Sequence, residues 1–331
     1  MTVVEAPEGL EGVVVTRTAI SDIDGETGRL TYRGCPLEDI VSQYGYEDIL
    51  AYLTELRREP PPQMVKAGDV SGDPMARLVT VLMTIPYDPQ RPLTYIQMVA
   101  LHLAATRHQV ADPGFGSLAY RYLTLLRNNE PSPREATALD TYWVTAAEHS
   151  LNASTFAVRI AASTGAPLPM ALAAGAATLS GPLHGGAPTG VVQLLREARE
   201  SGDVATLLRR KVDAGERLMG FGHRVYRTTD PRARILRQLC ESLPAARDSA
   251  TIAKTVEQEA LKVLRDRHPD RPLATNVEFY AGVLLYSLGI DAAWCPPTFA
   301  VARMAGWTAH YFEQRQHGRL IRPLARYQPP M

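Results

Sequence analysis

The sequence predicts an all-α protein with one small β-hairpin near its N-terminus. Apolar residues recur at the spacing of a helix over most of the 331 residues. Short clusters of proline, glycine and aspartate interrupt these stretches, as in Glu59-Pro60-Pro61-Pro62 and Ala111-Asp112-Pro113-Gly114. So many helices joined by such short connections leave no room for a strand-rich or alternating β/α architecture.

The hairpin is expected between residues 13 and 34. Residues 13–18 and 29–33 are rich in β-branched and aromatic side chains, which favour strands. Asp24-Gly25 and Thr27-Gly28 lie between them and have the composition of a turn. We therefore predict two antiparallel strands that flank these dipeptides.

After the hairpin, helical periodicity continues nearly to the end of the chain. The predicted helices are residues 37–56, 73–83, 93–106, 118–128, 135–163, 169–179, 189–199, 204–214, 231–241, 249–266, 277–288 and 298–316.

Composition and charge exclude several classes of protein. The formal net charge is zero and 45% of the residues are hydrophobic, which argues against a nucleic-acid-binding or polybasic membrane protein. Only four of the 35 basic residues are lysine. Genome base composition explains most of this bias, although a guanidinium group also recognises carboxylates and phosphates through paired hydrogen bonds.

Cysteine usage and the N-terminus indicate the compartment. Cys35, Cys240 and Cys295 are far apart and form no C-x-x-C pair, so neither a disulfide framework nor a zinc site is expected. The first twelve residues lack the apolar core of a signal peptide, and no apolar run approaches the length of a membrane span. We therefore expect a cytoplasmic protein without a bound metal.

Several familiar cofactor and nucleophile motifs are absent from the sequence. It contains no G-x-x-x-x-G-K-[ST], H-E-x-x-H or G-x-S-x-G motif. Gly220-Phe221-Gly222 begins like a dinucleotide-binding fingerprint, but it lacks the third glycine and a preceding strand.

Four segments place polar groups in small or apolar surroundings, and the first is residues 146–155, AAEHSLNAST. It is expected inside a long helix, where His149, Asn152 and Ser154 interrupt a run suited to tight packing. Taken alone, a buried structural histidine with a satisfied hydrogen bond explains His149.

The second segment, residues 180–187, is SGPLHGGA and sets His184 among glycines. Glycines let the backbone approach a ligand closely. The next helix is expected to begin near Thr189, and its free N–H groups favour an anion or a carbonyl oxygen. A plain glycine-rich connection between helices explains the segment equally well.

The third segment, residues 220–232, is GFGHRVYRTTDPR. Asp230-Pro231 is typical of an N-cap followed by proline at the first helical position. This places Arg232 in the first turn of a helix and His223 in the loop before it. Basic side chains around glycines favour an anion site over a solvated loop.

The fourth segment, residues 276–282, is NVEFYAG and contains Glu278, with Arg271 upstream. Taken alone, a surface glutamate near a helix start explains it, because the helix dipole favours acids there.

Taken together and in order, these segments resemble the citrate synthase family. The matching blocks are AEHSLNASTF, GPLHGGA, GFGHRVYRTTDPRA, NVEFYAG, FAVARMAGWTAHYFEQ and IRP, and TAISDIDGETGRLTYRG resembles the family's N-terminal signature. Residues 60–140 match weakly and are fewer than is usual in the family. The resemblance implies a two-domain helical subunit: residues 1–185 and 286–331 form a large, dimer-forming domain, and residues 186–285 form a small domain on the CoA side.

The resemblance also implies a reaction and its partners. Family members join acetyl-CoA, or a close acyl-CoA, to the ketone of oxaloacetate and hydrolyse the thioester to citrate and CoA. They are homodimers without a permanently bound cofactor, and the CoA thioester is a co-substrate. Two alternatives remain: a 2-methylcitrate synthase that uses propionyl-CoA, and a weakly active regulatory relative that binds oxaloacetate or CoA.

Residue roles follow from the motifs that match. The catalytic residues are Glu278, which removes the α-proton, His184, which donates a hydrogen bond to the thioester oxygen, and His223, which polarises the ketone. A weakly acidic carbon needs such a dry carboxylate base and such a donor. Oxaloacetate is held by His149, His223, Arg232, Arg303 and Arg322, of which Arg322 comes from the other subunit. CoA is contacted by Gly220, Gly222, Arg227 and Arg271.

Three positions depart from the family pattern. Glu278 stands where the family has aspartate, Ala281 replaces a usual serine, and Pro188 replaces an asparagine. Glutamate is one methylene longer than aspartate, and a misplacement near 1 Å can cost on the order of 100-fold in rate. The carboxylate chemistry is retained, but its placement must be accommodated by the pocket.

Overall fold

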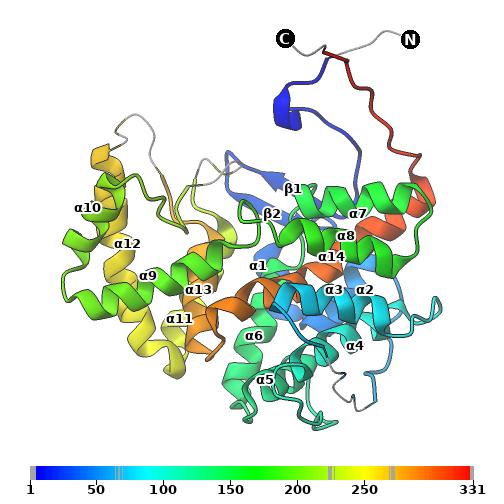
Figure 1. The fold of residues 1–331 in the computed structure, drawn as a ribbon, viewed down its shortest axis with the longest axis horizontal. Helices are drawn as coiled ribbons and strands as arrows, with labels where there is room; N and C mark the ends of the chain where they lie inside the picture. The colour runs from blue at the N-terminus through cyan, green and yellow to red at the C-terminus, as the bar shows by residue number, and fades with distance from the viewer. Residues whose placement is uncertain are drawn as a thin grey trace.

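The structure is a computed structural model that describes residues 5–63, 65, 68, 70–222, 226, 228–267, 269 and 273–328. It is 60% helical, with 14 α-helices and a three-stranded antiparallel sheet in the described parts of the chain. The predicted all-α class and the small N-terminal β-element are therefore confirmed (Figure 1).

The sheet lies further along the chain than predicted. Strand β1 (Ser21–Asp24) pairs with β2 (Arg29–Tyr32), and β3 (Cys35–Pro36) extends the sheet on the far side of β2. The prediction of a first strand at residues 13–18 is wrong. Oδ1 of Asp24 accepts hydrogen bonds from the N–H groups of Glu26 and Thr27, so the turn closes immediately after Asp24. The pairing strand must then end at Asp24.

One group of helices surrounds α14, which is buried on almost every side (Figure 1). A helix buried all round needs apolar or small residues on all its faces, and α14 supplies them. The group comprises α1 (Leu37–Gln43), α2 (Tyr46–Thr54), α3 (Pro74–Thr84), α4 (Pro92–Ala105), α5 (Leu118–Arg127), α6 (Pro133–Ala146), α7 (Ala153–Ser163), α8 (Leu168–Leu179) and α14 (Cys295–His317).

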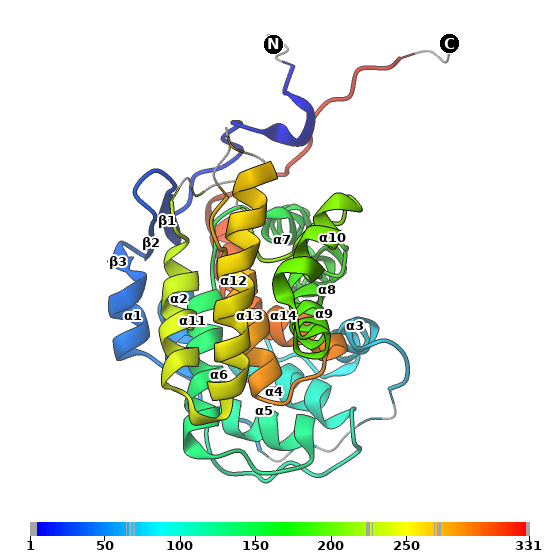
Figure 2. The same cartoon turned by 90° about the vertical axis from the view of Figure 1, so that its left-hand side faces the viewer.

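A second group packs together beside the first, on the left in Figure 1 and in front of α14 in Figure 2. The division into a large domain of residues 1–185 and 286–331 and a small domain of residues 186–285 stays a prediction. The second group comprises α9 (Ala187–Ser201), α10 (Val204–Asp213), α11 (Pro231–Ser242), α12 (Arg247–Arg267) and α13 (Val277–Ser287); short 3₁₀ turns lie at Glu8–Leu10, Pro244–Ala246 and Ala292–Trp294.

Two predicted helices are each broken into two. Residues 37–56 form α1 and α2, and the break falls at Tyr44-Gly45, where both carboxylate oxygens of Asp140 accept from the N–H of Tyr46. Residues 135–163 form α6 and α7, and residues 147–152 connect them. Asn152 caps α7 by accepting from the N–H of Thr155, so the first polar segment is a connection and does not lie within a helix.

Gly306 lets α14 approach this connection closely. Its N–H donates to the carbonyl of Ala147 over 3.2 Å. A Cβ at position 306 would overlap the carboxylate of Glu148 and the carbonyl of Ala147. The close contact between α14 and the α6–α7 connection therefore requires glycine.

Asp140 makes the unfolding free energy depend on pH. Burial raises the pKa of Asp140 to about 6, helped by the charges of Glu47 and Asp48. A raised folded-state pKa means that stability is lost as the pH rises from about 4 to about 6. We expect Asp140→Asn to raise the unfolding free energy at about pH 7.5 by about 2 kcal/mol and to give no gain near pH 4, measured by urea denaturation.

The matched control is Asp39→Asn on the exposed face of α1, which removes the same charge. Surface changes of this kind stay within about 0.5 kcal/mol. An Asp140→Asn protein that is less stable than the native protein at both pH values would show that its hydrogen bonds to Tyr46 outweigh the cost of burying the charge.

The two ends of the chain extend together from one side of the molecule (Figure 1). Arg326 and Glu5 form an exposed ion pair between them, with 2.7 Å between Nη1 and Oε1. In the described parts of the chain, no helix has the combination of length and apolar content needed to cross a membrane.

Candidate active site

A cleft of about 1150 Å³ lies where the two groups of helices meet. Its walls come from the N-terminal segment, the α6–α7 connection, the α8–α9 connection, the start of α13 and the middle of α14. Six of the predicted site residues line it together: His149, His184, Gly222, Arg232, Glu278 and Arg303.

The other five predicted residues are placed differently. Gly220 is buried beside the cleft, where a Cβ would lie 2.8 Å from that of Phe279, and its φ of +92° suits glycine. Arg322 is exposed in the segment after α14 and does not line the cleft of its own chain. His223, Arg227 and Arg271 lie outside the described residues, so their roles stay predictions.

Glu278 lies in the first turn of α13, as the sequence predicts. Asn276 caps this helix by accepting from the N–H of Glu278 over 3.0 Å. Burial raises the pKa of the Glu278 carboxyl above its ordinary value, although the charges of Arg232 and Arg217 act in the opposite direction. A carboxylate with a raised pKa is a stronger base, which suits proton abstraction.

His184 faces the cleft from the turn between α8 and α9. Its Nε2 lies 2.9 Å from Oγ of Ser154, which also accepts from Nε1 of Trp307 and donates to Oδ1 of Asn152. Burial, with help from the charge of Arg303, lowers the pKa of His184 to about 4. His184 is therefore neutral at physiological pH and can donate one hydrogen bond without carrying a charge.

This lowered pKa predicts a pH effect on stability. Between about pH 6.5 and pH 4 the unfolded chain binds a proton at His184 that the folded chain does not, so folding weakens as the pH falls. We expect the loss of unfolding free energy from pH 7 to pH 5 to be about 1–2 kcal/mol smaller in His184→Gln, measured by urea denaturation.

The exposed His317, at the end of α14, offers the matched control for that experiment. His317→Gln measures the effect of the substitution itself. If the unfolding free energy falls as steeply from pH 7 to pH 5 in His184→Gln as in the native protein, the assignment of a neutral imidazole at position 184 is contradicted.

Arg232 is fixed by a paired interaction with its own helix cap. Asp230 caps α11, and its two carboxylate oxygens accept from Nε and Nη2 of Arg232 over 3.0 and 2.8 Å. Oδ2 of Asp230 also accepts from the N–H of Val277, beside Glu278. One buried carboxylate thus orients a cleft arginine and fixes the start of the helix that carries the candidate base.

Arg303 brings a buried positive charge into the cleft from α14. Its guanidinium lies 4.9 Å above the ring of Phe299, and Nε and Nη1 have no hydrogen-bond partner among the described residues. Burial and the neighbouring charge of Arg232 lower the pKa of Arg303 to about 10. Two arginines close enough to affect each other, one with unsatisfied donors, create a site that favours a ligand with carboxylates.

His149 lines the cleft from the α6–α7 connection. Its Nε2 lies 3.2 Å from the hydroxyl of Tyr226, whose ring also lies beneath the guanidinium of Arg232. Tyr226 therefore links the buried imidazole of His149 to the guanidinium of Arg232.

Sequence reasoning missed several residues of this site. Asn152 and Ser154 were recognised as polar interruptions, but only the structure shows that they and Trp307 orient His184. Arg217 lines the cleft from the loop after α10, and no sequence pattern distinguishes it from other surface arginines. Phe299 was hidden in the apolar pattern of α14.

Comparisons with known proteins identify the family of the chain. A family model described as the citrate synthase C-terminal domain matches residues 9–324. Putative citrate synthase 2 of Mycobacterium tuberculosis (strain ATCC 25618 / H37Rv) is 41% identical over 348 residues, covering 97% of this chain and 92% of that protein. Citrate synthase 2 of Bacillus subtilis (strain 168) is 32% identical, covering 98% of this chain and 96% of that protein.

Solved structures give the same result for the fold. Citrate synthase from Thermotoga maritima MSB8 superposes with a TM-score of 0.80 at 26% identity, covering 98% of this chain and 96% of that chain. A ternary complex of citrate synthase from Thermoplasma acidophilum with carboxymethyl coenzyme A and oxaloacetate has a TM-score of 0.82 at 23% identity, covering 99% and 97%. The chain belongs to the citrate synthase family, and it is an enzyme.

Proposed function

We propose that this enzyme condenses acetyl-CoA, or a close short-chain acyl-CoA, with oxaloacetate and then hydrolyses the thioester to release citrate and CoA. The observation that carries the proposal is the cleft itself. It is lined by a carboxylate with a raised pKa, a neutral histidine and two buried arginines. A base, a neutral donor and a dicarboxylate site are the parts that this condensation needs.

Four cleft residues are proposed to bind the substrates and to move the proton. Arg232 and Arg303 bind the carboxylates of oxaloacetate, and Glu278 removes a proton from the carbon next to the thioester carbonyl. His184 donates a hydrogen bond to the thioester oxygen, where negative charge develops. This role requires the hydroxyl of Ser154 to turn from Oδ1 of Asn152 to Nε2 of His184, so that the imidazole proton lies on Nδ1 and is available to that oxygen.

The remaining steps form one bond and break another. The α-carbon of the acyl group attacks the ketone carbon, and the ketone oxygen takes up a proton. His223 is proposed to polarise this ketone and His149 to help hold oxaloacetate. Water then cleaves the thioester and releases CoA as a thiol, and Gly220, Gly222, Arg227 and Arg271 are proposed to contact CoA.

We also propose a homodimer, which the position of Arg322 supports. This arginine does not line its own cleft, although its motif assigns it to oxaloacetate binding. It lies in the extended C-terminal segment, where Leu320, Leu324 and Tyr327 are 60%, 71% and 80% exposed. Apolar side chains exposed to this degree along an extended segment favour burial against a second copy of the chain, whose cleft Arg322 would complete.

The test is thiol release from acetyl-, propionyl- and butyryl-CoA with oxaloacetate, with the product identified by mass spectrometry. Fast turnover of acetyl-CoA to citrate supports the proposal, and a preference for propionyl-CoA makes the enzyme a 2-methylcitrate synthase instead. Oxaloacetate binding by calorimetry without turnover of any acyl-CoA would indicate a binding protein. Glu278 motivates this alternative, since it is longer than the usual aspartate and would misplace the base. If the protein neither binds oxaloacetate nor turns over any of the three acyl-CoA substrates, the proposal is wrong.

A further inference from the structure

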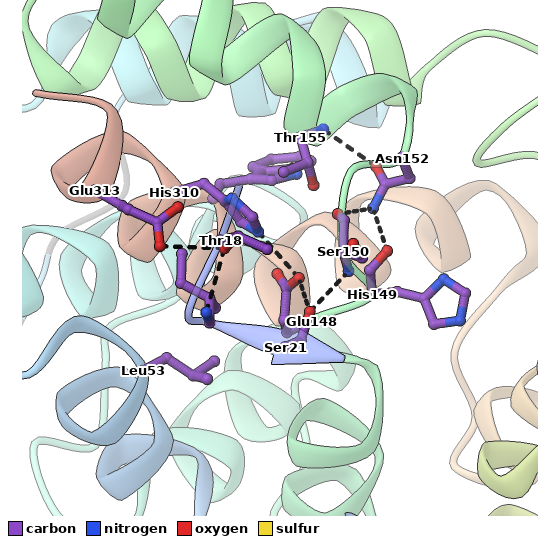
Figure 3. Close-up of polar contacts among 12 residues, drawn as sticks. Thr18, Ser21, Leu53, Glu148, His149, Ser150, Asn152, Thr155, His310 and Glu313 are labelled. Carbon is purple, nitrogen blue, oxygen red and sulfur yellow. Dashed lines mark hydrogen bonds and ion pairs between the residues drawn. The ribbon is translucent and has the colours of Figure 1, made fainter. Parts of the chain in front are cut away.

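The connection that carries His149 is held by polar contacts that reach the N-terminal segment and α14 (Figure 3). We call these residues the Glu148 network: Ser21, Glu148, Arg159, His310 and Glu313. They do not line the cleft, and the proposed reaction gives them no role.

Glu148 and Ser21 fix the connection directly. The buried Oε1 of Glu148 accepts from Oγ of Ser21 over 2.9 Å, and the same Oγ accepts from the N–H of Ser150 over 3.2 Å. Ser150 has a φ of +50°, which a serine rarely adopts, so the surroundings must hold it. His149 lies between these two anchored residues, and its ring points away from Glu148 (Figure 3).

His310 links Glu148 to Arg159, and these two partners fix which ring nitrogen of His310 carries the proton. Nη1 of Arg159 lies 2.7 Å from Nδ1 of His310, and Nε2 of His310 lies 3.0 Å from Oε1 of Glu148. Arginine can only donate, so Nδ1 accepts and the imidazole proton is on Nε2, which donates to Glu148. Burial alone would raise the pKa of Glu148, but His310, the charge of Arg303 and the bond from Ser21 hold it below its ordinary value.

The same network anchors the N-terminal segment. Nη1 of Arg159 donates to Oε2 of Glu313 over 2.6 Å, and Oε1 of Glu313 accepts from the N–H of Ala19 and the hydroxyl of Thr18. The residues just before this anchor, Leu10, Val13 and Val15 among them, form part of the cleft wall. One set of polar contacts therefore joins two separate parts of the cleft wall, the α6–α7 connection and the N-terminal segment.

We propose that His310 and Arg159 are positioning residues that orient His149 for oxaloacetate binding by holding Glu148 and Ser21 in one arrangement. The proposal rests on the proposed function of His149. It requires His310 as a neutral imidazole that donates through Nε2 and accepts through Nδ1. Loss of the contacts that His310 or Ser21 makes with Glu148 therefore weakens the affinity for oxaloacetate. The affinity for the acyl-CoA changes little.

The experiment compares two variants of the full-length protein. His310→Gln keeps a donor toward Glu148 and an acceptor toward Arg159, whereas His310→Leu removes both. We expect His310→Leu to raise the KM and the calorimetric Kd for oxaloacetate about 10–100-fold, while the KM for acetyl-CoA stays within about threefold. His310→Gln is expected to stay within about threefold of the native protein for both substrates.

A second pair of variants covers the case in which His310→Leu does not fold. Ser21→Ala deletes only the hydroxyl that bridges Glu148 and Ser150, and it is expected to raise the KM and Kd for oxaloacetate about 10-fold. Ser287→Ala, which deletes a hydroxyl bonded within α13, is the matched control and leaves both constants unchanged.

The outcomes separate this inference from the proposed function. If the native protein neither binds nor turns over oxaloacetate, the proposed function fails. If the native protein binds and turns over oxaloacetate but Ser21→Ala and His310→Leu leave its KM and Kd unchanged, the positioning role is overturned.

Nitrogen-15 spectra of histidine-labelled protein, assigned with His310→Gln, show which ring nitrogen of His310 carries the proton, without any substrate. A proton on Nδ1 of His310 near neutral pH would overturn the proposal.

Discussion

Glu278→Gln is expected to lower kcat about 1,000-fold while leaving oxaloacetate binding within about threefold. Glutamine keeps the size of the side chain but cannot accept the α-proton, and positioned general bases contribute about 100- to 10,000-fold to rate. The proposed oxaloacetate ligands Arg232, Arg303 and His149 also line the cleft, and this change leaves all three in place. Thiol release measures kcat, and calorimetry measures the Kd for oxaloacetate.

The exposed Glu200 on α9 provides the matched control, because Glu200→Gln makes the same change away from the cleft. The pH profile adds a second test. Burial raises the pKa of Glu278, so kcat/KM in the native protein should fall on the acid side at a pH above about 4.3, the ordinary value for glutamate. Undiminished turnover in Glu278→Gln would show that another group is the base.

Glu278→Asp then tests how the site accommodates the longer residue. Ala281 and Pro188 line the cleft with Glu278 and depart from the family pattern at the same time. If the cleft is built around glutamate, turnover falls in the aspartate variant. If turnover rises, the glutamate has misplaced the base in an otherwise complete site.

Arg303→Met is expected to make the unliganded protein more stable and to abolish most of its affinity for oxaloacetate. Nε and Nη1 of Arg303 are buried without a hydrogen-bond partner among the described residues, and the charge of Arg232 lies close enough to repel this guanidinium. Removing such a group relieves a desolvation cost of about 1–3 kcal/mol. Losing the charged donor for a substrate carboxylate raises the Kd by about 100-fold or more.

Thermal denaturation without ligand and calorimetry with oxaloacetate measure the two effects. Arg209→Met, on the exposed face of α10, makes the same substitution away from the cleft and serves as the control. An Arg303→Met protein that binds oxaloacetate as tightly as the native protein would remove Arg303 from the site.

Local sequence signals predicted the elements whose ends are fixed by neighbouring residues. Asp230-Pro231 begins α11, and Asn276 begins α13, because each cap accepts from an N–H two residues further on. Arg232 and Glu278 were therefore placed correctly in the first turns of their helices. The resemblance to the citrate synthase family is confirmed separately, by the family model that matches residues 9–324 and by the relatives that are 41% and 32% identical.

Elements fixed by distant residues could not be predicted. The helical pattern of residues 135–163 is continuous, but Ser21 and Tyr32 hold the break after α6 through contacts more than 100 residues away. Likewise Asp140 caps α2 across 94 residues of sequence. In both cases a tertiary contact overrides a local preference.

The contacts of Glu313 with the N-terminal segment determine when the binding site can be completed during synthesis. Glu313 and its partners Thr18 and Ala19 are separated by 295 and 294 residues. Chain segments so far apart meet late, because a loop of nearly the whole chain must close first. A nascent chain on the ribosome therefore cannot complete the cleft before α14 has emerged from the exit tunnel, because Arg303 and Glu313 both lie on this helix.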